Sequence, residues 1–151
     1  MQTVTRRQAL AFGAAATAYL TVGDVAPLLA TPAEADAEIA KFTGGKALEK
    51  GKITIDLPEI AENGNTVPLS IVVDSPMTTE SYISEVLVVA DGNPRPGVSL
   101  FRFTSLSGRA IAATRIRLQT TENIIVVAKT GDGKFITDRK QVKVTIGGCG
   151  G

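Results

Sequence analysis

The chain changes its hydrophobic pattern at Gly51. Before this glycine, residues 37–50 have the spacing of a helix, and the pair Gly44-Gly45 interrupts them. We therefore expect one short helix or two broken turns in this segment, because glycine favours neither a continuous helix nor a fixed backbone. Its few apolar anchors are Ile39, Phe42 and Leu48.

After Gly51, seven segments have the pattern of β-strands, by period-two alternation or by runs of β-branched residues. The predicted strands are 52–57, 66–74, 82–90, 98–104, 109–118, 123–129 and 134–146. Turn signals separate them, such as Asn63-Gly64 and the loop 91–97. Many short strands with little helix predict an all-β fold, an immunoglobulin-like antiparallel β-sandwich with a short N-terminal helix.

Residues 1–35 are predicted to be an export signal and are set apart from the fold. Arg6-Arg7 precede an apolar run over 9–22, whose 14 residues fall short of the ~20 needed to span a bilayer. Ala33-Glu34-Ala35 fits the cleavage pattern, and Ala35-Asp36-Ala37 is a second candidate. The paired arginines indicate a twin-arginine signal, with a general secretory signal as the alternative.

Composition excludes several kinds of chemistry. The 151 residues carry a net charge of +1, which gives no indication of a nucleic-acid partner. The chain has no His and one Cys, which excludes zinc sites that need several such ligands and every catalytic scheme that uses His as a base. An internal disulfide is impossible, and we expect no cofactor.

The single cysteine, Cys149, lies in a run of glycines at the carboxyl end. The flanking residues are Gly147, Gly148, Gly150 and Gly151. Glycine has no side chain to pack, so we expect residues 147–151 to form a flexible arm with a reach of roughly 17 Å. A slim arm suits insertion of the thiol into a narrow pocket of a partner. An exposed thiol outside the cell is otherwise a liability, because it oxidises and cross-links.

Three functions remain open at this point. The chain could be a carrier that holds a sulfur substrate on Cys149, or an exported binding or structural module whose cysteine forms an intermolecular disulfide and links two copies. A one-cysteine sulfurtransferase is disfavoured, because activation of a thiol requires a positively charged, shaped pocket around it. A thiol incidental to a disordered tail is the simplest alternative.

Several segments together resemble the SoxY family, the sulfur-carrying subunits of periplasmic thiosulfate oxidation. The most specific of them is the strand Val142–Ile146 followed by the run from Gly147 to Gly151. The others are 58–68, 73–77, 103–104 and 114–118.

The resemblance implies a carrier and not an enzyme, with Cys149 as the covalent attachment residue. It implies a heterodimer with a second sandwich subunit, SoxZ, and export of the folded pair to the periplasm. It also implies transient partners: the cytochrome SoxAX couples thiosulfate to the cysteine, the hydrolase SoxB releases sulfate, and a sulfane dehydrogenase acts where present. These partners hold the cofactors. The implied domains are the signal 1–35, the carrier domain 36–146 and the arm 147–151.

Other residues invite a functional role, and each has a simpler interpretation. Glu59 and Glu62 could be paired acid–base groups, but solvated loop charge is favoured. Arg115 and Arg117 could meet a sulfonate, but the outer face of a half-buried strand is favoured, with a subunit contact as the remaining alternative. The run 86–89 is expected in the core rather than at a subunit interface. Nothing in the sequence decides whether Met77 packs in the core or at an interface.

Overall fold

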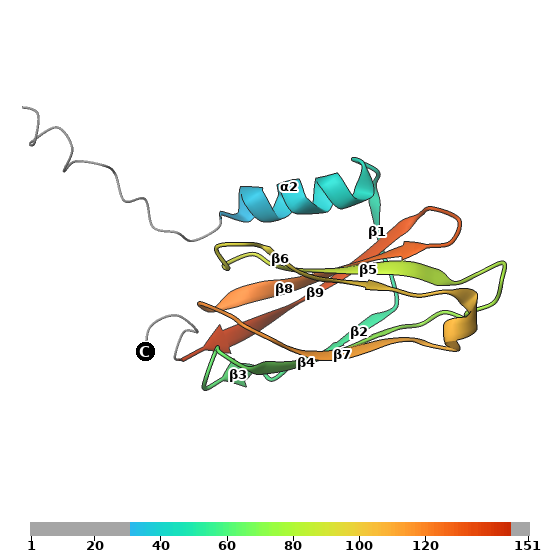
Figure 1. Ribbon diagram of the computed structural model, residues 1–151. Helices are drawn as coiled ribbons and strands as arrows, with labels where there is room; N and C mark the ends of the chain where they lie inside the picture. Colours follow the sequence, from blue (N-terminus) through green and yellow to red (C-terminus); the bar gives the residue numbers. More distant parts are fainter. Residues whose placement is uncertain (1–30, 146–151) are drawn as a thin grey trace, which may run out of the picture.

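The computed structural model describes residues 31–145, which form a two-sheet sandwich with one helix packed on its outside (Figure 1). The elements are α2 (Pro32–Thr43), β1 (Leu48–Lys50), β2 (Ile53–Asp56), β3 (Ile60–Ala61), β4 (Val67–Val73), β5 (Ile83–Ala90), β6 (Gly97–Arg102), the 3₁₀ turn η1 (Ser105–Ser107), β7 (Ala110–Ile116), β8 (Glu122–Thr130) and β9 (Phe135–Val144). The predicted immunoglobulin-like β-sandwich is confirmed.

The larger sheet has the order β1-β9-β8-β5-β6, and the smaller sheet has the order β2-β4-β7. Each of the seven predicted strands corresponds to one observed strand, from β2 and β4 through β9. The sequence analysis missed β1 and β3, which pair parallel with β9. They contain three and two residues, too few for an alternating pattern to be recognised.

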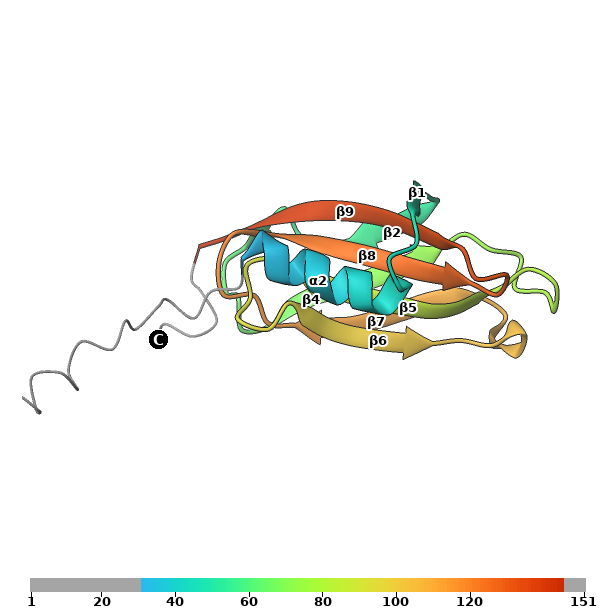
Figure 2. The same cartoon turned by 90° about the horizontal axis from the view of Figure 1, so that it is seen from above.

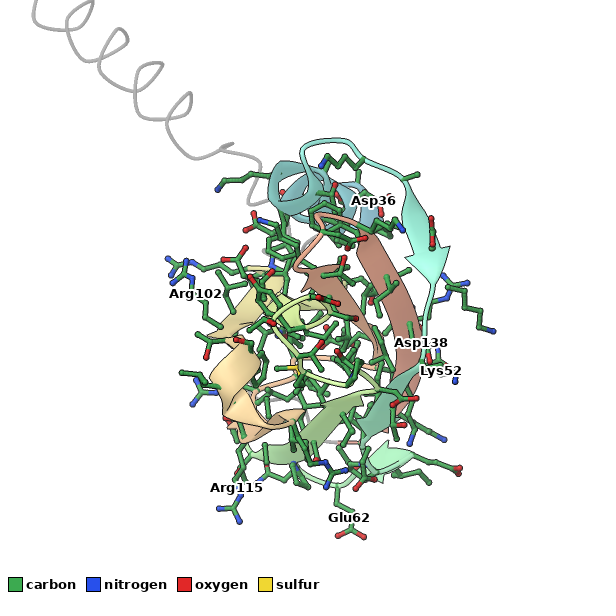
Figure 3. The ribbon with its side chains drawn as sticks, turned by 90° about the vertical axis from the view of Figure 1, so that its right-hand side faces the viewer. Asp36, Lys52, Glu62, Arg102, Arg115 and Asp138 are labelled. Atoms are coloured by element: carbon green, nitrogen blue, oxygen red, sulfur yellow. The ribbon has the colours of Figure 1, made fainter. Side chains whose placement is uncertain are left out.

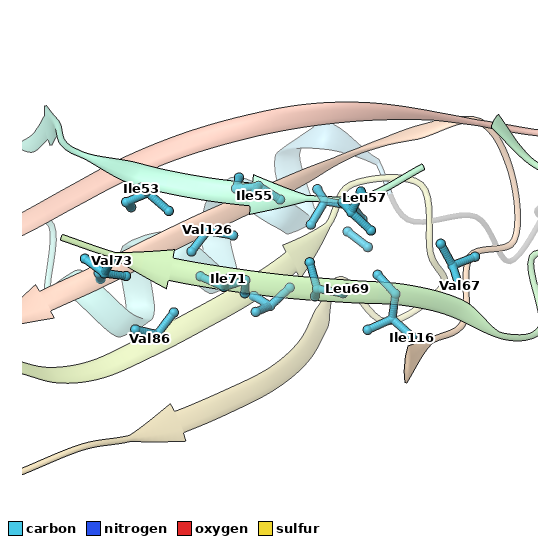
Figure 4. Packing of buried hydrophobic residues seen from close by; sticks show 14 of the residues in the cluster. Ile53, Ile55, Leu57, Val67, Leu69, Ile71, Val73, Val86, Ile116 and Val126 are labelled. Carbon is cyan, nitrogen blue, oxygen red and sulfur yellow. The ribbon is translucent and has the colours of Figure 1, made fainter. Parts of the chain in front are cut away.

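The main core lies between the two sheets and is built from aliphatic side chains (Figure 4). In β4, the residues Val67, Leu69, Ile71 and Val73 point inward and are at most 2% exposed. They face Val86 and Val126 of the larger sheet. Each such side chain contributes ~1.5–3 kcal/mol of burial free energy.

Strand β5 is buried on both of its faces, as its apolar sequence predicts. Val86 and Val88 point into the main core, whereas Leu87 and Val89 belong to a second cluster beneath α2. Figure 2 shows α2 lying across the middle strands of the larger sheet. The run 86–89 is therefore core, as expected, and Met77 is also buried in the main core at 5% exposure.

The helix differs from its predicted range: it begins at Pro32 and ends at Thr43. Its start is capped by Glu34, whose carboxylate accepts the backbone N–H of Thr31 at 2.9 Å. Gly44 ends it in the left-handed conformation at φ 64°. Leu48, expected as a helix anchor, lies instead in β1. The helix starts early because Ala35 and Ile39 pack against the sheet, a contact that the sequence pattern alone does not reveal.

Candidate functional site

The predicted attachment residue Cys149 and its neighbours Gly147, Gly148, Gly150 and Gly151 lie outside the described residues, as do residues 1–30 of the predicted signal. The structure does describe the base of the C-terminal segment, where β9 ends at Val144 and the described chain stops at Thr145. We call this point the root. It lies at the same end of the sandwich as the start of α2 (Figures 1 and 2).

On one side, the root is held by the segment 59–62, which includes β3. The backbone N–H of Lys143 donates to the carbonyl of Glu59 at 2.9 Å, and the N–H of Thr145 donates to the carbonyl of Ala61 at 3.1 Å. The Thr145 hydroxyl also donates to the carbonyl of Glu62 at 3.1 Å. These bonds hold the end of β9 in place, and sequence analysis missed them because β3 is so short.

On its other side, the root is held by Thr121. The Thr121 hydroxyl accepts the N–H of Val144 at 3.0 Å and lies 3.5 Å from the Val144 carbonyl, to which it donates. A threonine side chain thus replaces a strand partner beyond the last β8–β9 pair, Glu122 with Val142. The backbone of β9 is therefore bonded on both edges up to its last residue.

Glu122 is a buried carboxyl group beside the root, at 3% exposure. Its Oε2 accepts the N–H of Gly92 at 2.9 Å, and its Oε1 accepts the N–H of Gln119 at 3.2 Å. Burial raises the pKa of Glu122 above its usual value of 4.5, although the hydrogen bonds from the Gly92, Thr120 and Gln119 backbones lower it and Asp91 raises it. Sequence analysis did not single out this residue, because nothing in the local pattern shows that a strand-end glutamate is covered.

The loop 91–97 is fixed to the same end of the molecule by amide and carboxyl groups. Asp91 accepts the N–H and the side-chain amide of Asn123 at 2.8 and 2.7 Å. Asn93 donates to the carbonyl of Arg117 at 2.8 Å and accepts the N–H of Gln119 at 3.0 Å. Gly92 is required in this loop, because a Cβ there would lie 2.9 Å from the Cβ of Glu122.

The remaining candidates lie apart from any enclosed site. Glu59 and Glu62 are exposed, as expected of solvated loop charge, and Glu62 points away from the molecule in Figure 3. Arg115 lies on β7 and Arg117 lies just beyond its end, so the two do not share one strand as predicted. Both are exposed.

Within residues 31–145, no cluster of three or more acidic, His or Cys side chains could hold a metal ion. In the same described part, no helix is long and apolar enough to cross a membrane.

What the described residues provide at the root is a strand end held on both edges by backbone and hydroxyl groups. This arrangement suits a fixed base for the segment that follows.

Comparisons with known proteins agree with this architecture. The family model described as SoxY, sulfur oxidation protein SoxY, matches residues 39–149. The solved structure of the sulfur carrier protein SoxY from Chlorobium limicola f thiosulfatophilum is 30% identical with a TM-score of 0.65, covering 77% of this chain and 100% of that chain. A search of curated proteins gives no match.

Superoxide reductases share the fold alone. The superoxide reductase (neelaredoxin) from Ignicoccus hospitalis is 16% identical with a TM-score of 0.56, over 81% of this chain and 99% of that chain. The superoxide reductase from Nanoarchaeum equitans is 12% identical with a TM-score of 0.54, over 64% of this chain and 100% of that chain.

Proposed function

Because this chain belongs to the SoxY family of sulfur oxidation proteins, we propose that it is a covalent carrier whose Cys149 holds sulfur intermediates derived from thiosulfate and presents them to partner enzymes. The observation that supports this most is the place of Cys149 in the chain. The only cysteine lies between glycines, shortly after a strand end, at Val144, that is bonded on both edges.

The proposed chemistry needs a sulfur nucleophile and no metal in this subunit. The Cys149 thiolate and the outer sulfur of thiosulfate form an S–S bond, and the two electrons released are taken up, one at a time, by the oxidised cytochrome partner SoxAX, which passes them on. Water, activated by the hydrolase SoxB, then cleaves the bond to the sulfonate, which releases sulfate and two protons and leaves a persulfide on Cys149. A sulfane dehydrogenase, where present, accepts six electrons as three water molecules convert that remaining sulfur to a sulfonate, with release of six protons. SoxB then hydrolyses the sulfonate to sulfate and frees the Cys149 thiolate.

In this proposal, the chain acts in the periplasm as a heterodimer with SoxZ. Residues 1–35 direct export by the twin-arginine route, which transports folded proteins, so the pair crosses the membrane assembled. Residues 36–146 then form the carrier domain, and residues 147–151 form the arm that carries the thiol.

Intact-mass spectrometry tests the proposal. Wild-type chain incubated with SoxZ, SoxAX and thiosulfate is expected to gain the mass of a thiosulfate adduct. Hydrolysis by SoxB is then expected to lower this mass to that of a persulfide. Cys149→Ser is expected to gain neither mass, while its circular dichroism and its association with SoxZ stay unchanged. Wild-type chain whose thiol is first blocked with iodoacetamide serves as the matched control and is also expected to gain neither the thiosulfate nor the persulfide mass.

Other outcomes identify the alternatives. A disulfide-linked dimer as the only new mass would favour a binding or structural module. Thiosulfate turnover by the isolated chain would favour an enzyme. An adduct that persists in Cys149→Ser would contradict the assignment of the attachment residue.

A further inference from the structure

Both cleavage motifs that the sequence predicts lie inside α2. Ala33-Glu34-Ala35 and Ala35-Asp36-Ala37 fall within the helix, which begins at Pro32 and ends at Thr43. Proteases bind the residues around the bond they cut as an extended strand, whose backbone N–H and C=O groups pair with the enzyme. In a helix these groups bond within the chain. Neither motif can therefore enter a signal peptidase while the first turns of α2 are formed.

The first turn of α2 is held closed at its start. The Glu34 carboxylate accepts the backbone N–H of Thr31 at 2.9 Å. In return, the carbonyl of Thr31 accepts the N–H of Glu34 at 2.9 Å and that of Ala35 at 3.4 Å. Pro32 occupies the start of the helix, where its fixed φ favours the helical backbone and its missing N–H costs nothing. These contacts span the whole of the first motif.

The residue common to both motifs is also covered by the sheet. Ala35 is 1% exposed, and Ile39, one turn later, is 8% exposed. Both belong to the cluster beneath α2, with Val89 and Val127 of the larger sheet, and Figure 2 shows the helix lying on this sheet. A cut after Ala35 would require the first turn to leave the sheet, and proteolysis at a covered site proceeds only through such an opened state.

The backbone is extended at Thr31, directly before the helix. This residue has φ −87° and ψ 153° and is exposed. Ala30 precedes it in the sequence and supplies the small side chain that a signal peptidase requires directly before the cut bond. Leu28 stands where the A-x-A pattern has its first alanine, which explains why the sequence pattern alone favoured residues 33–37.

We propose that the signal is removed at the bond between Ala30 and Thr31, so that the exported protein keeps the whole of α2. Hydrolysis of this bond consumes one water molecule and leaves a carboxylate on Ala30 and an ammonium on Thr31. The Glu34 carboxylate, which already accepts the N–H of Thr31, would then pair with that ammonium. The helix cap is thus retained as an ion pair after processing.

The inference rests on export of the chain in folded form, which is part of the proposed function. The twin-arginine route delivers folded proteins, so the peptidase meets α2 already packed on the sheet. A chain exported unfolded by the general secretory route would instead present the motif at 33–35 without hindrance. The proposal moves the end of the signal from residue 35 to residue 30.

The test is the N-terminus of the full-length chain expressed with SoxZ and recovered from the periplasm, determined by intact mass and N-terminal sequencing. We expect a chain that begins at Thr31. Ala30→Phe is expected to lower the yield of this form at least ~10-fold, because a large side chain directly before the cut bond is not accepted. Ala33→Phe is the matched control. Ala33 is exposed, and its substitution disables the motif at 33–35 but should leave processing at Thr31 unchanged.

A second pair of variants tests whether α2 shields the motif. Ile39→Ala loosens the helix from the sheet and is expected to raise the share of chains that begin at Asp36 at least ~5-fold, because the opened state becomes more populated. Ile55→Ala removes a similarly buried side chain, at 9% exposure, from the main core and should leave that share unchanged. Circular dichroism checks the fold, and Ile39→Val with Ile55→Val replace the pair if either does not fold. Equal shares in the two variants would contradict the shielding.

The outcomes separate this inference from the proposed function. Wild-type protein that begins at Asp36 or Glu38, or that retains residues before Thr31, would overturn the inference, as would loss of processing in Ala33→Phe. If the chain begins at Asp36 and Cys149 gains its adduct, the carrier function stands and the inference fails. If the chain begins at Thr31 and Cys149 gains no adduct, the processing site stands and the carrier function fails.

Discussion

Glu122 keeps an ionisable carboxyl group in a buried position beside the root. Both of its oxygens accept backbone N–H groups, from Gly92 and Gln119. Gln119 lies in the β7–β8 connection, three residues before Glu122. Gly92 lies in the β5–β6 loop, 30 residues away in the chain, so this second donor reaches Glu122 only in the folded protein. The carboxylate therefore holds two connecting segments together at the end of the sandwich where β9 ends.

Glu122→Gln is expected to lower the free energy of unfolding by ~1–3 kcal/mol at neutral pH, because the amide NH₂ would face an N–H and leave it unpaired. Wild type binds the Glu122 proton more tightly when folded, since burial raises the pKa. The contribution of Glu122 to the free energy of unfolding therefore falls as pH rises from 4.5 through the raised pKa. The Glu122→Gln variant lacks this pH dependence.

The measurement is urea denaturation of both proteins at several values of pH. The advantage of wild type over the variant should be largest below pH 4.5, the usual pKa of the group, and should shrink as pH rises from there through the raised pKa. Glu80→Gln at an exposed position is the control for the substitution itself and should change the unfolding free energy by less than ~0.5 kcal/mol. A pH-independent difference would contradict the role of burial.

Thr121 provides the second residue-scale prediction. Thr121→Val keeps the shape of the side chain and removes the hydroxyl that accepts the N–H of Val144. We expect a loss of ~1 kcal/mol in unfolding free energy and faster amide exchange at Val144. The neighbouring exposed Thr120→Val should change stability by less than ~0.5 kcal/mol. Equal effects of the two variants would show that the Thr121 hydroxyl does not hold β9.

At the scale of elements, the first turn of α2 overlaps the predicted end of the signal. The candidate cleavage motif Ala33-Glu34-Ala35 lies inside the helix, and Ala35 is 1% exposed against the sheet. A chain that begins at Asp36 would lose the Glu34 cap and the Ala35 contact. We expect it to be less stable than a chain that begins at Thr31 by ~1–3 kcal/mol.

Urea denaturation of the two forms measures this difference, and the N-terminal mass of exported protein shows which form the cell makes. Equal stability would mean that the first turn adds nothing to the fold. A chain from Thr31 with Glu34→Gln retains the length and weakens only the charged part of the cap. It should lie between the two forms.

The proposed arm, residues 147–151, is the other segment with a testable role. If Cys149 is the attachment residue, deletion of Gly150 and Gly151 is expected to slow its processing by SoxAX and SoxB severalfold, because the negatively charged C-terminal carboxylate would then lie on Cys149 itself and repel anionic thiosulfate. Thermal stability should stay the same. Gly150→Ala with Gly151→Ala retains the length and is the control. A large fall in the unfolding temperature on deletion would mean that these residues contribute to the packed fold.

At the scale of the whole molecule, charge is divided between regions while the net charge is only +1. Residues 31–91 contain 11 acidic and four basic residues, whereas residues 92–121 contain five arginines and no other charged residue. The small net charge of the whole chain is thus the sum of unlike segments.

Much of the fold was readable from the sequence. Strands such as β2 and β4 alternate inward apolar positions with outward ones, because side chains of a half-buried strand point to opposite faces, and this period is local. The turns at Asn63-Gly64 and at 91–97 were likewise visible as local signals. The position of Cys149 among glycines was also visible as a pattern, although its geometry lies outside the described residues.

The sequence by itself therefore determined the seven longer strands, the sandwich class, the family and the candidate thiol, since each depends on the identity and spacing of neighbouring residues. Only the tertiary structure decided that β1 and β3 pair with β9, that Glu122 is buried, and that α2 begins at Pro32. Each of these depends on contacts between segments far apart in the chain, and no local pattern encodes which distant segment will cover a residue or leave it uncovered.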